Sequence, residues 1–182
     1  GRNLYQRSLQ RPLGKGSPSL ASPVTPCIFV SHRRADADMA VAVAQLLVEM
    51  NLDVWLDLHE LNRPEPSSEA EHLALTHAIE TGLQSSTHLI ALVTPQTQGS
   101  WWVPFEIGSC RALRKGLAFL LHRDVANPPS YMIAGERLAD KRALCEWAEA
   151  IAAKPDTVSV LALRQISKTS GIDKFIRASR WG

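Results

Sequence analysis

The sequence predicts an α/β fold in which a five-stranded parallel sheet is covered by helices on both faces. Short apolar runs typical of buried parallel strands alternate with longer stretches whose apolar residues recur at helical spacing. The length of 182 residues suits one domain with a short appendage, and a hydrophobic fraction of 45% is enough for a core. Strands that alternate with helices pair in parallel through right-handed crossovers, and five of them fit the flavodoxin-like order 2-1-3-4-5.

Each element is predicted from its own local pattern. The expected strands are Cys27–Ser31, Asp53–Leu56, Thr87–Val93, Leu117–Leu121 and Val158–Val160. The expected helices run from a cap at Asp36 to Met50, from Ser67 or Ser68 to Leu83, through Glu106 to Gly116, from Glu136 to Ala152, and from Ile172 to Arg180. Two prolines, at 64 and 66, exclude regular structure in the loop between the second strand and the second helix.

Composition excludes several function classes. The net charge of +2 is too small to predict nucleic-acid binding, and no apolar run approaches the ~18 residues that a membrane span needs. The three cysteines show neither metal-ligand nor CxxC spacing, which favours buried thiols in a reducing, cytoplasmic compartment. We interpret residues 1–25, which are basic and rich in Ser, Pro and Gly, as a flexible or accessory segment that is no secretory signal, and residues 26–182 as the domain.

Polar and aromatic residues gather where three predicted strands end. Ser31 ends the first strand, Asp57 follows the second, and Trp102 and Glu106 begin the helix after the third. Ligands of open α/β sheets bind at the carboxyl ends of the strands, so these loops are expected to converge on one crevice. Trp102 lies one helical turn before Glu106, and the two side chains can share a face toward a flat base or a ribose.

Four segments in order resemble the Toll/interleukin-1 receptor (TIR) domain family. Residues 28–32, Ile-Phe-Val-Ser-His, with Asp36 five positions after Ser31, are similar to the first box of that family. Residues 54–57, Val-Trp-Leu-Asp, resemble the strand that enters its BB loop, and residues 79–86 the segment that follows the loop. The spacing Trp102-x-x-x-Glu106 resembles its WxxxE signature. Together the boxes extend the resemblance over residues 26–180.

The resemblance implies an enzyme that cleaves the ribose–nicotinamide bond of NAD+, as many bacterial, plant and axon-degeneration TIR domains do. It implies Glu106 as the catalytic residue, NAD+ as the substrate, and no cofactor or metal. The candidate substrate-binding residues are Ser31, His32, Arg33, Arg34, Asp57 and Trp102. The guanidinium of Arg34 and the backbone after Ser31 are candidates for the pyrophosphate, because guanidinium matches phosphate geometry.

Several questions stay open at this level. The product is ADP-ribose if water attacks the ribose, or a cyclic ADP-ribose if a group of the same molecule attacks. The bacterial branch of the family implies homotypic assembly, an antiphage or NAD-depleting role, and a downstream effector that senses the product. Residues 62–66, Asn-Arg-Pro-Glu-Pro, stand where bacterial members often carry a Gly-Asp pair, so no pocket residue is assigned in the BB loop. The alternatives are a non-enzymatic TIR–TIR interaction module and, ranked lower, a nucleoside deoxyribosyltransferase-like enzyme.

Overall fold

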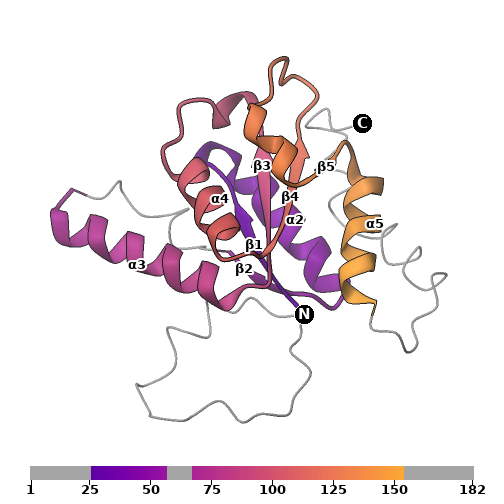
Figure 1. The fold of residues 1–182 in the computed structure, drawn as a ribbon, viewed down its shortest axis with the longest axis horizontal. Coiled ribbons are helices and arrows are strands. Elements are labelled where there is room, and N and C mark those ends of the chain that lie inside the picture. The colour runs from indigo at the N-terminus through magenta and orange to yellow at the C-terminus, as the bar shows by residue number, and fades with distance from the viewer. Residues whose placement is uncertain (1–25, 57–66, 154–182) are drawn as a thin grey trace, which may run out of the picture.

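The computed structural model describes residues 26–56 and 67–153, which form a three-layer α/β fold around one parallel sheet (Figure 1). The strands are β1 (Cys27–Ser31), β2 (Asp53–Trp55), β3 (His88–Val93), β4 (Gly116–Leu121) and β5 (Glu136–Leu138). They are paired in parallel in the order β2-β1-β3-β4-β5. The predicted flavodoxin-like order is therefore confirmed.

In the described part of the chain, helices cover both faces of the sheet (Figure 1). The helices are α2 (Ala37–Glu49), α3 (Glu69–Ser85), α4 (Trp102–Ala112) and α5 (Lys141–Ala152), with short 3-10 turns at Arg34–Asp36, Pro95–Thr97 and Ser130–Ala134. Successive side chains of a strand point to opposite faces, so Ile28 and Val30 pack with α2 and α5, while Cys27 and Phe29 pack with α3 and α4. Each strand end therefore presents side chains to both helical layers.

The end of the described chain corrects two predictions. The expected helix Glu136–Ala152 begins too early, because Glu136–Leu138 pairs with β4 as the fifth strand. Helix α5 starts only after Asp140, whose carboxylate caps it by accepting a 2.8 Å hydrogen bond from the amide of Ala143. The assignment of the fifth strand to 158–160 was thus wrong; that segment and the expected helix at 172–180 lie outside the described residues, as does the segment 1–25.

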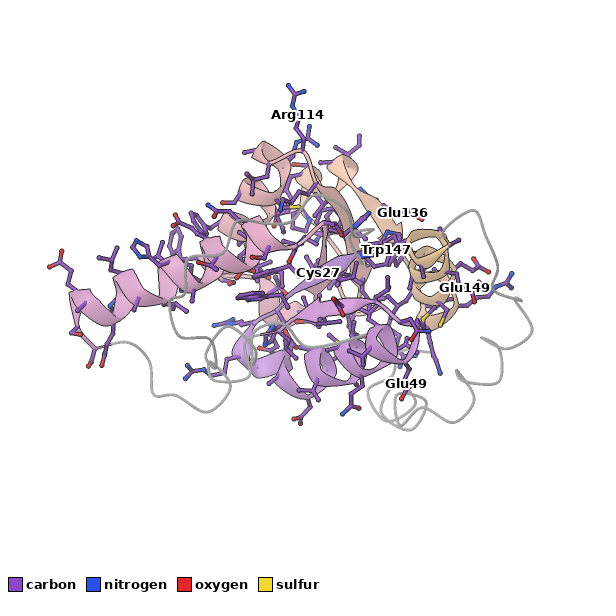
Figure 2. The ribbon with its side chains drawn as sticks, turned by 90° about the horizontal axis from the view of Figure 1, so that it is seen from below. Cys27, Glu49, Arg114, Glu136, Trp147 and Glu149 are labelled. Carbon is purple, nitrogen blue, oxygen red and sulfur yellow. The ribbon has the colours of Figure 1, made fainter. Side chains whose placement is uncertain are left out.

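The buried residues of helix α3 lie in its C-terminal half, at Ile79, Gly82 and Leu83. Ser68 forms the predicted N-terminal cap, in a reciprocal capping box with Glu71. At the other end the ammonium of Lys115 donates to the carbonyls of Leu83 (2.6 Å) and Gln84 (2.7 Å), which places a positive charge at the negative end of the helix dipole. The N-terminal turns of α3 extend beyond the sheet (Figures 1 and 2).

Gly82 of α3 provides a testable packing constraint. A Cβ at this position would lie 2.3 Å from Nε1 of Trp55, a side chain only 5% exposed. Alanine is favoured over glycine in a helix by about 1 kcal/mol, but overpacking costs about 1–3 kcal/mol. We expect Gly82→Ala to lower the free energy of unfolding, measured in urea, by about 1 kcal/mol. The control is Gly108→Ala in α4, where nothing lies within 4 Å and the helix preference alone acts; equal effects of both variants would contradict the prediction.

His88 predicts how stability depends on pH. Its imidazole lies half-buried at the start of β3, 6.0 Å from the ring of Trp147 in an edge contact, and burial lowers its pKa from the ordinary 6.5. Trp147 belongs to α5, which packs beside this strand end (Figure 2). The His88 imidazole is therefore protonated more readily in the unfolded chain than in the folded one. The contribution of His88 to the free energy of unfolding is complete above about pH 6.5 and declines as the pH falls below it. Urea unfolding between pH 7.5 and 5 should give a shallower pH dependence for His88→Gln than for the wild type; identical slopes would refute this.

Candidate functional site

The centre of the candidate site is a contact between Ser31, the last residue of β1, and Glu106 of α4. Alternation along β1 directs Ser31 to the same sheet face as Phe29, where α4 packs. The Ser31 hydroxyl donates a short hydrogen bond to Oε2 of Glu106. Both side chains are buried, with exposed fractions of 1% and 5%. Two of the three loops predicted to converge at the carboxyl edge of the sheet therefore do so.

A small hollow borders the Glu106 carboxylate. Its walls come from β1, from His32, from Trp55 at the end of β2, and from Ala78 and Ile79 of α3. The space open to a water-sized sphere is about 10 Å³, which is room for about one water molecule. Sequence reasoning missed Trp55 and Ile79 here, although the position of Trp55 at the carboxyl end of a strand was a signal for it.

The polar side chains of the loop after β1 differ in the contacts that they make with the rest of the protein. The imidazole of His32 lies 3.2 Å from the carbonyl of Val30 through Nδ1, beside the hollow. Arg33 donates through Nη1 to the carbonyl of Gln96. Arg34 is exposed, and among the described residues its guanidinium makes no hydrogen bond or ion pair. Of the two predicted guanidinium ligands, one is thus already engaged by the protein and the other is available to a ligand.

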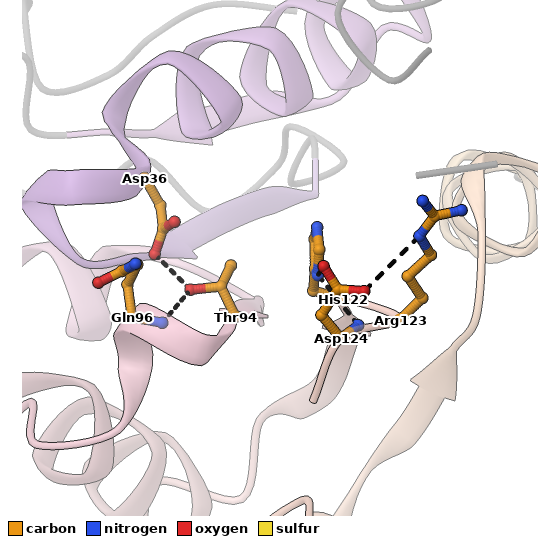
Figure 3. A network of polar contacts seen from close by, with 6 residues as sticks. All are labelled: Asp36, Thr94, Gln96, His122, Arg123 and Asp124. Carbon is orange, nitrogen blue, oxygen red and sulfur yellow. Dashed lines mark hydrogen bonds and ion pairs between the residues drawn. The ribbon is translucent and has the colours of Figure 1, made fainter. Parts of the chain in front are cut away.

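Asp36 occupies the predicted N-cap position of α2 but does not cap it with its side chain. Its carboxylate instead accepts a 2.9 Å hydrogen bond from the hydroxyl of Thr94, at the end of β3 (Figure 3). Burial raises the pKa of Asp36 above its ordinary value, an effect that the bond from Thr94 and the nearby His32 and His122 partly offset. The capping prediction was therefore wrong in its contact, and the side chain links two strand ends.

Trp102 lies one turn before Glu106, at the start of α4, and is half-buried. Its ring meets that of Phe105 edge-on, with centroids 5.9 Å apart, and it is not among the residues that line the hollow. A direct role for Trp102 beside the substrate thus stays a prediction. Asp57, the remaining candidate, lies outside the described residues.

Comparison with protein families identifies the chain. A family model described as the TIR domain matches residues 28–154, from β1 to just past α5. The chain belongs to the TIR family. A comparison with curated proteins finds no match. The matched range includes both Ser31 and Glu106.

No three His, Cys, Asp or Glu side chains among residues 26–56 and 67–153 gather as ligands for a metal ion. Over the same ranges no helix combines the length and apolar character that crossing a bilayer requires.

Proposed function

We propose that this TIR domain is an NAD+ nucleosidase in which Glu106 is the catalytic residue. The observation that carries the proposal is the position of the Glu106 carboxylate, buried at the carboxyl edge of the sheet and held by the Ser31 hydroxyl. A carboxylate fixed at the place where α/β sheets bind their ligands is suited to electrostatic stabilisation of a developing cation.

The chemistry needs little beyond that carboxylate. Nicotinamide leaves NAD+ as a neutral base from a cationic ring, so its departure requires no general acid. Positive charge then develops on the ribose, and a carboxylate beside the sugar stabilises this oxocarbenium-like state. The same group can orient the ribose hydroxyls or accept a proton from the attacking group. Attack by water gives ADP-ribose, and attack by a group of the same molecule gives a cyclic ADP-ribose.

The surroundings of Glu106 suggest how the rest of the nucleotide is held. Arg34 is an exposed cation at this edge whose guanidinium makes no contact with the described residues, and the start of α2 adds a partial positive charge for the pyrophosphate. The hollow beside Glu106 has room for only about one water molecule, so in this proposal its walls separate before a nucleotide enters. In this proposal, homotypic assembly of TIR domains supplies that rearrangement. In this proposal the product acts as a signal for a downstream effector, as in antiphage systems.

Incubation with NAD+ over a range of protein concentrations tests the proposal. Mass spectrometry of the products would separate hydrolysis from cyclisation, and a steep rise of specific activity with concentration would support assembly. Release of no nicotinamide at any concentration, crowded solutions included, would reject the nucleosidase. A panel that adds deoxynucleosides would detect the deoxyribosyltransferase-like alternative.

An apolar surface favours a second candidate, a TIR–TIR interaction module without catalysis. Ile133 is 86% exposed, Phe105 of α4 is 40% exposed, and a groove of about 390 Å³ runs between α4 and the turn at Ser130–Ala134. Exposed apolar patches of this kind are typical of protein interfaces. The module would bind a second TIR domain, by analytical ultracentrifugation or pull-down, and Ile133→Asp would abolish that binding. Binding without any NAD+ turnover would favour this candidate.

A further inference from the structure

Two loops at the carboxyl edge of the sheet are fastened together by contacts separate from the Ser31–Glu106 pair. Arg33, after β1, donates to the carbonyls of Gln96 and Gln98 in the loop after β3, the second at 3.4 Å. Asp36, three residues on, accepts from the hydroxyl of Thr94 at 2.9 Å (Figure 3). We call this set of contacts, made by Arg33 and Asp36 to residues 94–98, the loop clamp.

The clamped loop leads directly to the helix that bears Glu106. Within this loop the hydroxyl of Thr94 accepts a 3.1 Å hydrogen bond from the amide of Gln96, and the hydroxyl of Thr97 donates one of 3.1 Å to the carbonyl of Leu92. The hydroxyl of Ser100 then accepts the amide of Val103 at 3.3 Å, in the first turn of α4. The amide of Ser100 also donates to the carbonyl of Thr97 at 3.0 Å, so a series of hydrogen bonds joins the end of β3 to the start of α4.

The two neighbouring arginines differ in what their donors already bind. Both side chains are exposed, but Arg33 directs Nη1 at two backbone carbonyls, whereas the guanidinium of Arg34 makes no hydrogen bond or ion pair with the described residues. A guanidinium has five N–H donors in a fixed fork, so orienting one edge toward carbonyls also sets the direction of the rest. A phosphate ligand needs that fork to face the ligand, which favours Arg34 in that role.

We infer that Arg33 and Asp36 are positioning residues: they hold the loop after β1 against the loop that leads to α4, and leave Arg34 as the cation that meets the substrate pyrophosphate. This inference rests on the proposed function, and it changes the expected role of Arg33. Loss of the loop clamp alters the geometry at the ribose, whatever substrate is bound. Loss of Arg34 removes a contact that only a phosphate-bearing substrate can make.

Two substrates separate these roles. NAD+ carries the pyrophosphate, and nicotinamide riboside has the same scissile bond without any phosphate. Arg33→Gln is expected to lower kcat/KM about tenfold for both substrates, with Arg33→Lys in between because lysine keeps the charge and most of the reach of the donor. Arg34→Gln is expected to lower kcat/KM about tenfold for NAD+, through KM, and to leave nicotinamide riboside unchanged. A loss confined to NAD+ in Arg33→Gln, or no loss at all, would overturn the inference.

Hydrogen exchange tests the loop clamp without any turnover. The amides of Thr97 and Ser100 bond to backbone carbonyls within the clamped loop. We expect about tenfold faster exchange of these amides in Arg33→Gln and in Thr94→Val, which lacks the hydroxyl, but not in Thr94→Ser, which keeps it. The amide of Leu144 in α5 is the internal reference. Unchanged exchange in both disruptive variants would reject the loop clamp, whereas faster exchange in a protein that cleaves neither substrate would reject the nucleosidase alone.

Discussion

Replacement of Glu106 by glutamine is expected to slow NAD+ cleavage by about a thousandfold. Glutamine keeps the size and the polar character of the side chain but removes the negative charge that would face the ribose in the transition state. Removal of one preorganised electrostatic group from an enzyme site costs about 10²–10³ in kcat, and here the lost group carries a full charge. The measurement is nicotinamide release at saturating NAD+, with purified wild type and variant at equal concentration.

Two matched variants make that loss interpretable. Glu106→Asp keeps the charge but withdraws it by one methylene, so we expect an intermediate activity. Glu80→Gln removes an exposed carboxylate from α3 and should leave turnover unchanged. Burial of an ion is costly, so Glu106→Gln should unfold at a temperature no lower than the wild type. A Glu106→Gln protein that releases nicotinamide at the wild-type rate would show that Glu106 is only a buried structural residue.

The parts of the fold that the sequence predicted are those with continuous apolar runs. β1, β3 and β4 are buried on both faces, and such strands are recognisable without knowledge of their neighbours. β5 was missed because it has three residues, of which only Leu138 is buried. Its charged residues Glu136 and Arg137 instead resembled the start of the helix that follows. The aspartate cap at Asp140 was the local signal that would have placed the helix boundary correctly.

The site was predictable as far as topology determines it. Parallel strands bring their carboxyl ends to one edge, which made the meeting of Ser31 with the loop that carries Glu106 expected. The contacts of Arg33 and Asp36 were not predictable, because they depend on where one loop presents backbone carbonyls and a hydroxyl to another. From residue type alone, an arginine after β1 can be either a phosphate ligand or a structural hydrogen-bond donor. Only the three-dimensional arrangement distinguishes Arg33 from Arg34.

Ser31→Ala is the second large effect that we expect, a loss of about tenfold to a hundredfold in kcat. The hydroxyl fixes one oxygen of the Glu106 carboxylate, and a hydrogen bond to a charged group contributes about 1.5–3 kcal/mol. The same bond also draws electron density from the carboxylate and so weakens its attraction for the ribose cation. Removal of the hydroxyl therefore strengthens that attraction, an effect opposite to the loss of orientation. We expect loss of orientation to dominate, because electrostatic catalysis depends on a group that is already in place when charge develops.

The control for Ser31→Ala is Ser31→Cys, which replaces the hydroxyl by a weaker donor of similar shape and should retain more activity than alanine. Single-turnover kinetics is expected to assign the loss to the chemical step, with KM nearly unchanged, because Ser31 is 1% exposed and its hydroxyl is engaged by Glu106. A rise in KM with kcat intact would instead mean that Ser31 contacts the substrate directly. Faster turnover in Ser31→Ala would mean that the hydroxyl competes with the ribose for the carboxylate, and that the Ser31–Glu106 bond must break before the reaction.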